Sequence, residues 1–281
     1  MKVSIITVTY NSEKFLADCI ESVRKQTYGN IEHIIVDGKS TDATLKIINK
    51  YSKFISSWIS ETDRGIYDAV NKGMRMATGD IIGILNSDDM LASADVIMDI
   101  VATFDETGVE AIYGDLAFVH PENTQKLLRY WKSSPYKRSR FKYGWMPAHP
   151  TFYIRKELVS KFGEYENHYI TAADYEFMAR YLYLNKVNAG YLPKLLVKMR
   201  TGGASNSSIY KRLRANRRDY LAMKRNNIPF AFLVSILKPI IKIPQFRRAW
   251  GHKMMNRDTF DKYYSISVSF FPAEQKAVAD K

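Results

Sequence analysis

The sequence predicts an α/β fold whose sheet is built from parallel βαβ units. Short apolar runs rich in β-branched residues alternate with stretches of helical periodicity through residues 1–107. The run from Val3 to Val8 is almost continuously apolar, as a strand covered on both faces requires. The chain has 281 residues, which suits one large domain or a smaller domain with an appendage.

The first half divides into four strands with helices between them. The helix that follows the first strand carries an apolar stripe, and Cys19 falls on that stripe as core filler. We expect strands at residues 3–8, 31–36, 54–59 and 80–85, and helices from Ser12, from Thr41 or Asp42 to about Lys53, over 65–77 and from Ser93.

Beyond residue 108 the pattern is less regular and richer in Tyr and Trp. We expect strands over 110–119, 126–131 and 187–200, a loop over 136–150 and a helix over 171–185. The segment 201–208 contains two Gly and three Ser, which is typical of a hinge. The predicted organisation is therefore a main domain over 1–205, with halves 1–107 and 108–205, and an extension over 206–281.

The composition is that of a globular protein, with 46% hydrophobic and 25% charged residues. A single cysteine excludes an intramolecular disulfide framework and a cysteine-based zinc site, and it fits a reducing compartment. No apolar run reaches the ~18 residues of a membrane-spanning helix. The first residues are typical of a strand and not of a signal peptide.

The formal charge of +13 is concentrated at one end of the chain. Residues 211–281 hold 16 Lys/Arg and 5 Asp/Glu, a net charge of +11, whereas residues 1–210 hold 26 and 24, a net charge of +2. The sequence thus describes a nearly neutral body with a strongly basic tail, and the two are interpreted separately.

All four predicted strands of the first half end in polar residues, three of them with acids. Ligands of open α/β sheets bind beyond these carboxyl ends. Asp88 and Asp89 follow the fourth strand, and such hard oxygen ligands suit Mg²⁺ or Mn²⁺ bridging phosphates, although a turn before a helix cap is the alternative. No Gly-rich dinucleotide loop or phosphate-binding loop follows the first strand, which disfavours dehydrogenases and P-loop hydrolases.

Several motifs in order resemble those of the family 2 glycosyltransferases. They are VSIITVTYNSEKFLADCIESVRKQTY, IEHIIVDGKSTDATLKII and DRGIYDAVNKGMRMATGDIIGILNSDD, followed by YGD, HPTFYIRKEL and AADYEFMAR, and they cover roughly residues 1–200. The resemblance implies the GT-A fold, a Rossmann-like mixed central sheet with helices on both faces, here with a C-terminal helical tail. Short bacterial enzymes of this type build capsule, lipopolysaccharide or exopolysaccharide units.

The resemblance implies a binding site for a nucleotide-sugar donor, with UDP the favoured nucleotide. Asp37 would accept a hydrogen bond from the base, and Asp88 would bind the divalent cation. Asn86 stands where many members have Asp, which should weaken metal affinity. The full set implied for the donor is Thr7, Thr9, Tyr10, Asp37, Asp63, Arg64, Asn71, Lys72, Asn86, Ser87 and Asp88.

Asp174 matches the position of the family's catalytic base, although Ala173 replaces the Glu that usually precedes it. A stabilising acid in the first turn of a helix is the alternative for Asp174. We expect Asp89, Trp145 and His149 to border the acceptor, and His149 could instead contact the diphosphate or the metal. For His149, a loop histidine bonded to backbone is the alternative, and Trp145 could equally be core.

These roles imply an inverting transferase that moves a sugar from the donor to a hydroxyl of a glycan or a lipid-linked saccharide. A metal-dependent sugar-nucleotide hydrolase and a non-enzymatic membrane or nucleic-acid binding protein are the alternatives. A hydrolase would release free sugar whether or not an acceptor is present, whereas a transferase forms a glycoside with the acceptor. A binding protein would have no turnover for the substitutions Asp88→Ala and Asp174→Asn to abolish.

The basic tail predicts contact with an anionic membrane. Residues 228–250 combine apolar side chains with Lys and Arg, and Pro239 and Pro244 prevent a span. Contact through residues 211–262 would place the enzyme in the cytoplasm, peripheral on the inner face of the cell membrane. Packing on the body or on a second subunit, as in a homodimer, is the alternative. Nucleic acid is not expected, because no motif for it is present.

Overall fold

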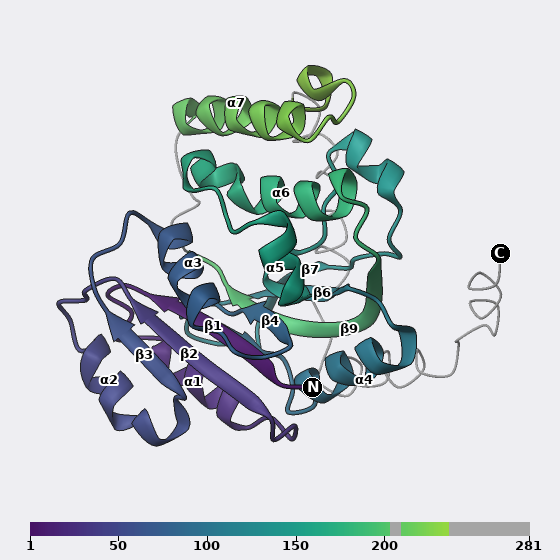
Figure 1. The fold of residues 1–281 in the computed structure, drawn as a ribbon. Coiled ribbons are helices and arrows are strands. Elements are labelled where there is room, and N and C mark those ends of the chain that lie inside the picture. Colours follow the sequence, from purple (N-terminus) through teal and green to yellow (C-terminus); the bar gives the residue numbers. More distant parts are fainter. Residues whose placement is uncertain (203–208, 236–281) are drawn as a thin grey trace.

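The computed structural model describes residues 1–202 and 209–235, and it shows a mixed sheet flanked by helices (Figure 1). Residues 203–208 and 236–281 lie outside the described part. The predictions for most of the hinge at 201–208, and for the larger part of the amphipathic stretch at 228–250, fall on those residues.

The first half of the chain supplies four parallel strands in the order β3-β2-β1-β4. The strands are β1 (Val3–Thr9), β2 (Ile31–Asp37), β3 (Ser57–Ser60) and β4 (Ile81–Ile84), and the helices are α1 (Leu16–Arg24), α2 (Thr44–Lys50) and α3 (Ile66–Met76), with a 3₁₀ turn η1 (Ser52–Phe54). One face of these strands packs on α3 and the other on α1 and α2, so the buried strands read as apolar on both sides.

The second half extends the sheet as β8-β6-β9-β5, with β7 paired to β6. Its elements are β5 (Asp89–Leu91), α4 (Val96–Thr107), β6 (Ala111–Val119), β7 (Leu127–Trp131), η2 (Arg138–Tyr143), η3 (His149–Thr151), β8 (Tyr153–Arg155), α5 (Glu157–Phe162), η4 (Asn167–Ala172), α6 (Ala173–Met178), the π-helical η5 (Ala179–Leu184), β9 (Ala189–Arg200) and α7 (Ile209–Arg225). The predicted α/β class with a mixed central sheet is confirmed.

The two halves are joined where β8 pairs antiparallel with β4, opposite Ile82 and Gly83. A Cβ at Gly83 would lie 2.1 Å from a ring carbon of Tyr153, so only glycine lets the Tyr153 ring cross β4 at this point. The sheet is therefore continuous from the first half into the second.

Several predicted boundaries differ from the structure. The third strand was expected to start at Phe54, but Phe54 lies in η1 with its ring exposed, and β3 begins at Ser57. The helix expected over 171–185 is composite, because α6 passes into the π-helical η5 at Ala179. The expected loop over 136–150 contains the 3₁₀ turns η2 and η3, and the short strands β5 and β8 were not predicted.

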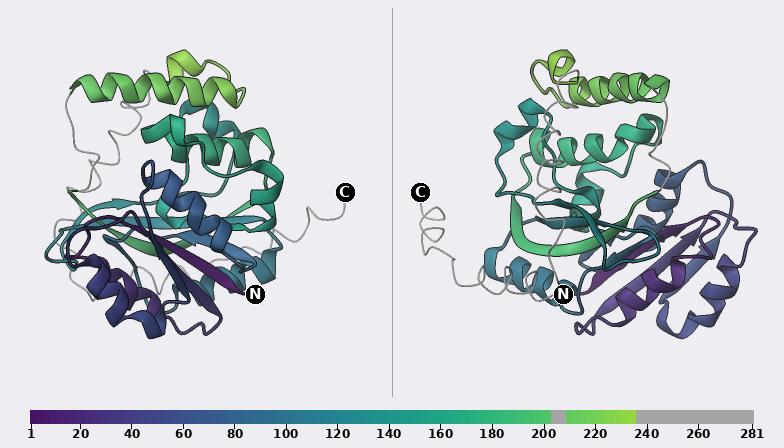
Figure 2. Two further views of the ribbon diagram at one scale, coloured as in Figure 1. Left: turned by 60° about the vertical axis from the view of Figure 1, so that its left-hand side comes forward. Right: turned by 180° about the vertical axis from the view of Figure 1, so that it is seen from behind.

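The first part of the C-terminal extension, residues 209–235, packs on the second half of the body. Ala222 and Met223 of α7, and Asn226 directly after it, are fully buried, and α7 contacts α6 and η4. Figure 2 shows α7 lying across the outside of α6, on the side away from the sheet. Among the described residues, no helix is long and apolar enough to cross a membrane.

Candidate active site

Loops after β1, β2 and β4 meet at the carboxyl edge of the sheet, because Thr9 of β1 pairs with Asp37 of β2 and β4 runs parallel beside β1. Asn11, at φ 48°, donates its backbone N–H to Ser40 Oγ over 2.8 Å. Ser12 Oγ lies 2.9 Å from Ser87 Oγ and so links the first loop to the loop after β4. These bonds hold three loops together around one edge.

Asp37, the last residue of β2, joins the loop after β2 to the neighbouring strand β3. It is fully buried, and its carboxylate accepts hydrogen bonds from Ser40 N at 3.0 Å and from Ser60 Oγ at 2.6 Å. Ser40 Oγ also donates to it. The predicted contact of Asp37 with a base stays a prediction, and the structure gives the carboxylate a second task of fixing the β2–α2 loop.

Tyr10, Gly38 and Asp63 form the outer rim of the same edge. A Cβ at Gly38 would lie 2.5 Å from Asp63 Oδ2 and 3.4 Å from a Tyr10 ring carbon, so both side chains pack closely over the Gly38 backbone. Tyr10 is 63% exposed, and Asp63 Oδ1 accepts a hydrogen bond from Gly65 N at 2.8 Å. An accessible aromatic ring beside a carboxylate suits stacking and hydrogen bonding to a nucleobase.

The two predicted cations of the Asp-Arg-Gly segment have different surroundings. The side chain of Arg64 is 85% exposed and lies 3.2 Å from Asp68. Lys72 is mostly covered, and its Nζ donates to Thr62 O at 2.9 Å and lies 2.9 Å from Glu61 Oε1. Arg64 is therefore free to meet an anionic ligand, whereas Lys72 holds the β3–α3 loop.

Three of the predicted donor residues lie behind this surface. Thr7 is fully buried with its hydroxyl 3.0 Å from His33 Nε2, and Thr9 is 4% exposed, without a hydrogen-bond partner for its hydroxyl in the described residues. Asn71 uses both ends of its amide on the backbone of Tyr165, at 2.8 and 2.9 Å. In this structure Thr7 and Asn71 support the site from inside.

The turn from Asn86 to Asp89 follows β4. Asp89 donates its backbone N–H to Asn86 O over 3.0 Å, and Asn86 Nδ2 donates to Asp89 Oδ2 over 3.2 Å. Asp88 is partly exposed, whereas Asp89, expected at the acceptor, is fully buried. Arg200, at the end of β9, donates Nη1 to Asp88 O over 2.9 Å and fixes the turn from the opposite side. Arg200 was not predicted as a residue of the site. Its positive charge at the end of a predicted strand was the only feature of the sequence that pointed to it.

The chemistry of this turn fits a hard divalent cation. Burial raises the pKa of Asp88, and burial together with the charge of Asp88 raises the pKa of Asp89 well above its ordinary value. Asp89 Oδ1 is buried and lacks a hydrogen-bond donor among the described residues. No group of three or more His, Cys, Asp or Glu that could hold a metal occurs within 1–202 and 209–235. A cation here would take its other ligands from phosphate and water, as Mg²⁺ commonly does.

A second polar cluster, around Asp174, forms where three separate elements meet. Asp174 lies in the first turn of α6, and Tyr67 of α3 donates its hydroxyl to Asp174 Oδ2 over 2.9 Å. His149 of η3 places Nε2 3.7 Å from the same oxygen. Both the Asp174 and His149 side chains are partly exposed, at 22% and 32%. The structure thus brings together two residues predicted separately, and it adds Tyr67.

Tyr67 is a positioning residue that sequence reasoning missed. Burial and the nearby Asp174 charge raise the pKa of Tyr67. The Tyr67 hydroxyl therefore stays protonated and donates a hydrogen bond to the carboxylate. Its ring stacks on Tyr165 at 5.2 Å between centroids, Tyr165 stacks on Phe177 at 4.0 Å, and Phe177 stacks on Tyr181 at 4.2 Å. This aromatic column links α3 to α6, and it fixes the direction from which Tyr67 reaches Asp174.

Trp145 lies in an aromatic cluster below the 3₁₀ turn η3. Its ring packs edge-on against Tyr113 at 6.0 Å and against Phe141 at 5.6 Å, and it is half-buried. Asp115, on the same strand as Tyr113, accepts hydrogen bonds from the Tyr130 and Tyr191 hydroxyls, and burial raises its pKa to about 6. Core packing therefore accounts for much of the Trp145 surface, and its role as a sugar platform stays a prediction.

The fold is that of the GT-A glycosyltransferases. The model of glycosyl transferase family 2 matches residues 4–163, and the chain belongs to that family. A PGL/p-HBAD biosynthesis glycosyltransferase of Mycobacterium tuberculosis is 30% identical over 213 residues, which cover 74% of this chain and 80% of that protein. An uncharacterised glycosyltransferase of the same species is 33% identical over 181 residues, which cover 63% of this chain and 68% of that protein.

Solved structures show the same fold. S. aureus TarS 1-349, crystallised with UDP-GlcNAc, matches at a TM-score of 0.67 and 21% identity over 90% of this chain and 80% of that one. The match spans only 44% of the longer TarS chain in another crystal structure. A mannosyltransferase from Pyrobaculum calidifontis, in complex with GDP-Man and Mn²⁺, matches at a TM-score of 0.60 and 16% identity. This match covers 95% of this chain and 79% of that one. The family assignment favours a transferase over the hydrolase and the non-enzymatic alternatives.

Proposed function

We propose that this enzyme transfers a glycosyl group with inversion from a UDP-sugar to a hydroxyl of a glycan or lipid-linked saccharide. The observation that carries the proposal is the Asp174 carboxylate, which is partly exposed, held by the Tyr67 hydroxyl and placed beside His149. A carboxylate with one oxygen fixed and the residue open to solvent suits a general base that accepts a proton from an acceptor.

The donor would bind across the carboxyl edge of β1, β2 and β4. Tyr10 and Asp63 offer an aromatic face and a carboxylate to the base, and Arg64 offers an exposed charge to the diphosphate. Asn86, Ser87 and Asp88 border the same edge. UDP is favoured because the TarS structure holds UDP-GlcNAc, and GDP is the alternative because the mannosyltransferase structure holds GDP-Man.

Asp88 is the residue that would hold Mn²⁺ or Mg²⁺, with Asn86 and Asp89 completing the turn around it. When bound, such a cation neutralises charge on the departing diphosphate. The oxygen-only donor set and the buried, unpaired Asp89 oxygen support this assignment.

The transfer proceeds by one displacement. The acceptor oxygen bonds to the anomeric carbon as the bond from that carbon to the diphosphate oxygen breaks, and the nucleoside diphosphate leaves. Asp174 accepts the hydroxyl proton during the attack, and Tyr67 holds Asp174 Oδ2 through its own hydroxyl. Attack from the face opposite the leaving group inverts the anomeric configuration.

Product analysis tests the proposal. The full chain is incubated with UDP-, GDP- and dTDP-sugars and candidate acceptors in Mn²⁺ or Mg²⁺, and products are examined by mass spectrometry and by NMR of the anomeric proton. We expect an acceptor-dependent glycoside of inverted configuration and loss of its formation with a chelator. Free sugar formed at the same rate without an acceptor, or retained configuration, would contradict the proposal.

A further inference from the structure

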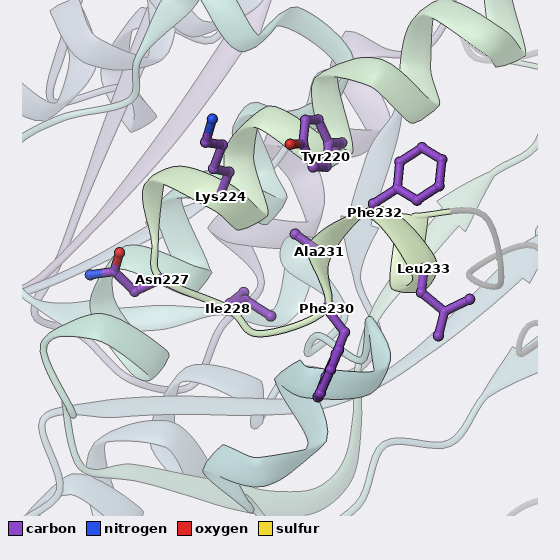
Figure 3. A pocket seen from close by; sticks show the side chains of 8 residues that line it. All are labelled: Tyr220, Lys224, Asn227, Ile228, Phe230, Ala231, Phe232 and Leu233. Carbon is purple, nitrogen blue, oxygen red and sulfur yellow. The ribbon is translucent and has the colours of Figure 1, made fainter.

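An apolar surface stands exposed at the end of the described part of the extension. Beyond the C-terminus of α7, Phe230 is 78%, Phe232 68% and Leu233 54% exposed. Figure 3 shows these three side chains pointing away from the backbone of the turn at Phe230 and of the helical segment 231–235 that follows it. Together with Tyr220 and Lys224 they line an open hollow of about 640 Å³. We call Phe230, Phe232 and Leu233 the apolar tip.

The apolar tip is additional to the apolar face that folds the extension. Ile228, Ala231 and Val234 alternate with the tip residues and are buried in the main core cluster. The core contact of residues 226–235 is therefore satisfied without Phe230, Phe232 and Leu233. Exposed aromatic residues gathered in this way mark an interaction surface.

The backbone of this loop adopts conformations that expose the tip. Asn227 has φ 54° and Phe230 has φ 56°, and the left-handed region is unfavourable for a bulky residue such as Phe. Strain of this kind is retained where a local shape has a task.

The charges beside the tip are cationic. Residues 211–235 contain seven Lys or Arg and one acid, Asp219. Arg217 and Lys224 are exposed on α7, and Lys224 lines the hollow next to the tip. Exposed aromatic rings flanked by cations match the interface of an anionic membrane, where rings enter the headgroup layer and cations meet phosphates.

We propose that the apolar tip inserts into an anionic lipid surface, with Lys224 and Arg217 lying against the headgroups. The segment that carries the tip contacts α6, because Asn226 Nδ2 donates to Glu176 Oε1 over 3.4 Å and Arg225 Nε lies 3.8 Å from the same oxygen. Glu176 lies two residues after Asp174 in α6. If the proposed function holds, this linkage keeps the base near a lipid-linked acceptor.

Vesicle co-sedimentation of the full chain tests this proposal. The unchanged protein, the double variant Phe230→Ser/Phe232→Ser and the control Phe54→Ser are mixed with vesicles of phosphatidylcholine alone or with phosphatidylglycerol. Phe54 is 51% exposed on η1, directly after α2, so its substitution removes an exposed ring from another part of the surface. We expect sedimentation with the anionic vesicles, at least about tenfold weaker for the double variant and unchanged for the control.

Three outcomes would overturn the proposal. They are undiminished binding by the double variant, equally strong binding to neutral vesicles, and a change of the double variant's oligomeric state in analytical ultracentrifugation, which would assign the tip to a second copy. Nucleotide-sugar affinity is measured in parallel and should be equal in all three proteins. Vesicle binding that follows the prediction while no protein transfers sugar would reject the proposed function alone.

Discussion

At the scale of single residues, Tyr67 makes a hydrogen bond to the proposed base, Asp174, that the sequence did not predict. The resemblance places Ala173 where family members carry Glu, and Ala173 is fully buried and apolar. The Tyr67 hydroxyl reaches Asp174 Oδ2 from α3 instead, at 2.9 Å. We therefore propose that a helix of the first half of the chain orients the proposed base.

Tyr67→Phe should lower kcat about tenfold and leave donor affinity unchanged, because the ring stays in its stack while the hydrogen bond to Asp174 is lost. Steady-state kinetics with varied donor and acceptor measure this. Tyr181→Phe is the matched control, since its hydroxyl bonds Gly163 O in the same aromatic column and makes no contact with Asp174. An equal fall in kcat for both variants would reduce Tyr67 to a structural role.

His33 gives the stability of the nucleotide half a pH dependence. It lies beneath Thr7, almost fully buried, and burial lowers its pKa from 6.5 to about 4. The folded state holds His33 neutral, so its contribution is complete above pH 6.5 and is lost as pH falls through 4.

Wild-type protein should lose up to about 3 kcal/mol of unfolding free energy between these pH values through this group, as 1.36 kcal/mol per pKa unit implies. Denaturant titrations at several pH values compare the wild-type protein with the His33→Asn variant. In the variant, the part of the pH dependence of the unfolding free energy that comes from His33 should vanish. An unchanged pH slope in the variant would show that other groups cause the acid loss.

The sequence predicted the positions of the candidate site residues better than it predicted their contacts. Tyr10, Asp63, Arg64 and Asp88 lie at the predicted edge because strand ends of a parallel sheet converge. Thr7 belongs to the same motif but points inward, since alternate residues of a strand face opposite sides. Proximity of His149 to Asp174 depends on the path of two loops, which no local pattern encodes.

At the scale of elements, the Glu176–Arg180 pair decides whether α6 holds its place. Glu176 is fully buried, and Arg180 Nη2 lies 3.0 Å from it. Arg180 also donates to the carbonyls of Phe162, Gly163 and Glu164, and so ties α6 to the end of α5. Removal of the Arg180 guanidinium would leave the buried Glu176 carboxylate with only the more distant charge of Arg225 beside it.

Arg180→Met should therefore lower the free energy of unfolding by about 3 kcal/mol or more. Arg75→Met is the matched control, because Arg75 pairs with Glu164 while 63% exposed and should cost less than about 1 kcal/mol. Urea titration of both variants measures the difference. Equal losses would mean that burial of the pair has no energetic consequence.

Long apolar runs made β1, β2 and β4 predictable, because a strand buried on both faces leaves a strong signal. The strands β5 and β8 have three residues each and could not be predicted from periodicity. They exist because β9 and β4 offer hydrogen-bonding edges beside them. The π-helical turns after Ala179 likewise reflect tertiary packing, since the sequence reads as one helix.

At the scale of the whole molecule, the split of charge corresponds to a split of tasks. The nearly neutral body carries the two acidic clusters at Asp88 and Asp174, and the basic surplus belongs to residues 211–281. Contacts of α7 with α6 and η4 join the two parts. The proposed base, Asp174, and the proposed membrane contact thus both lie on the second half of the body.

The central claim is that Asp174 acts as the base in glycosyl transfer, and the Asp174→Asn variant tests it most directly. Its transfer rate and its affinity for the nucleotide-sugar are measured together, with Glu157→Gln, an exposed carboxylate on α5, as control. We predict that the transfer rate falls by about 10²- to 10⁴-fold, with donor affinity and the control unchanged. Transfer at the wild-type rate, or a loss of donor affinity as large as the loss of rate, would contradict the claim.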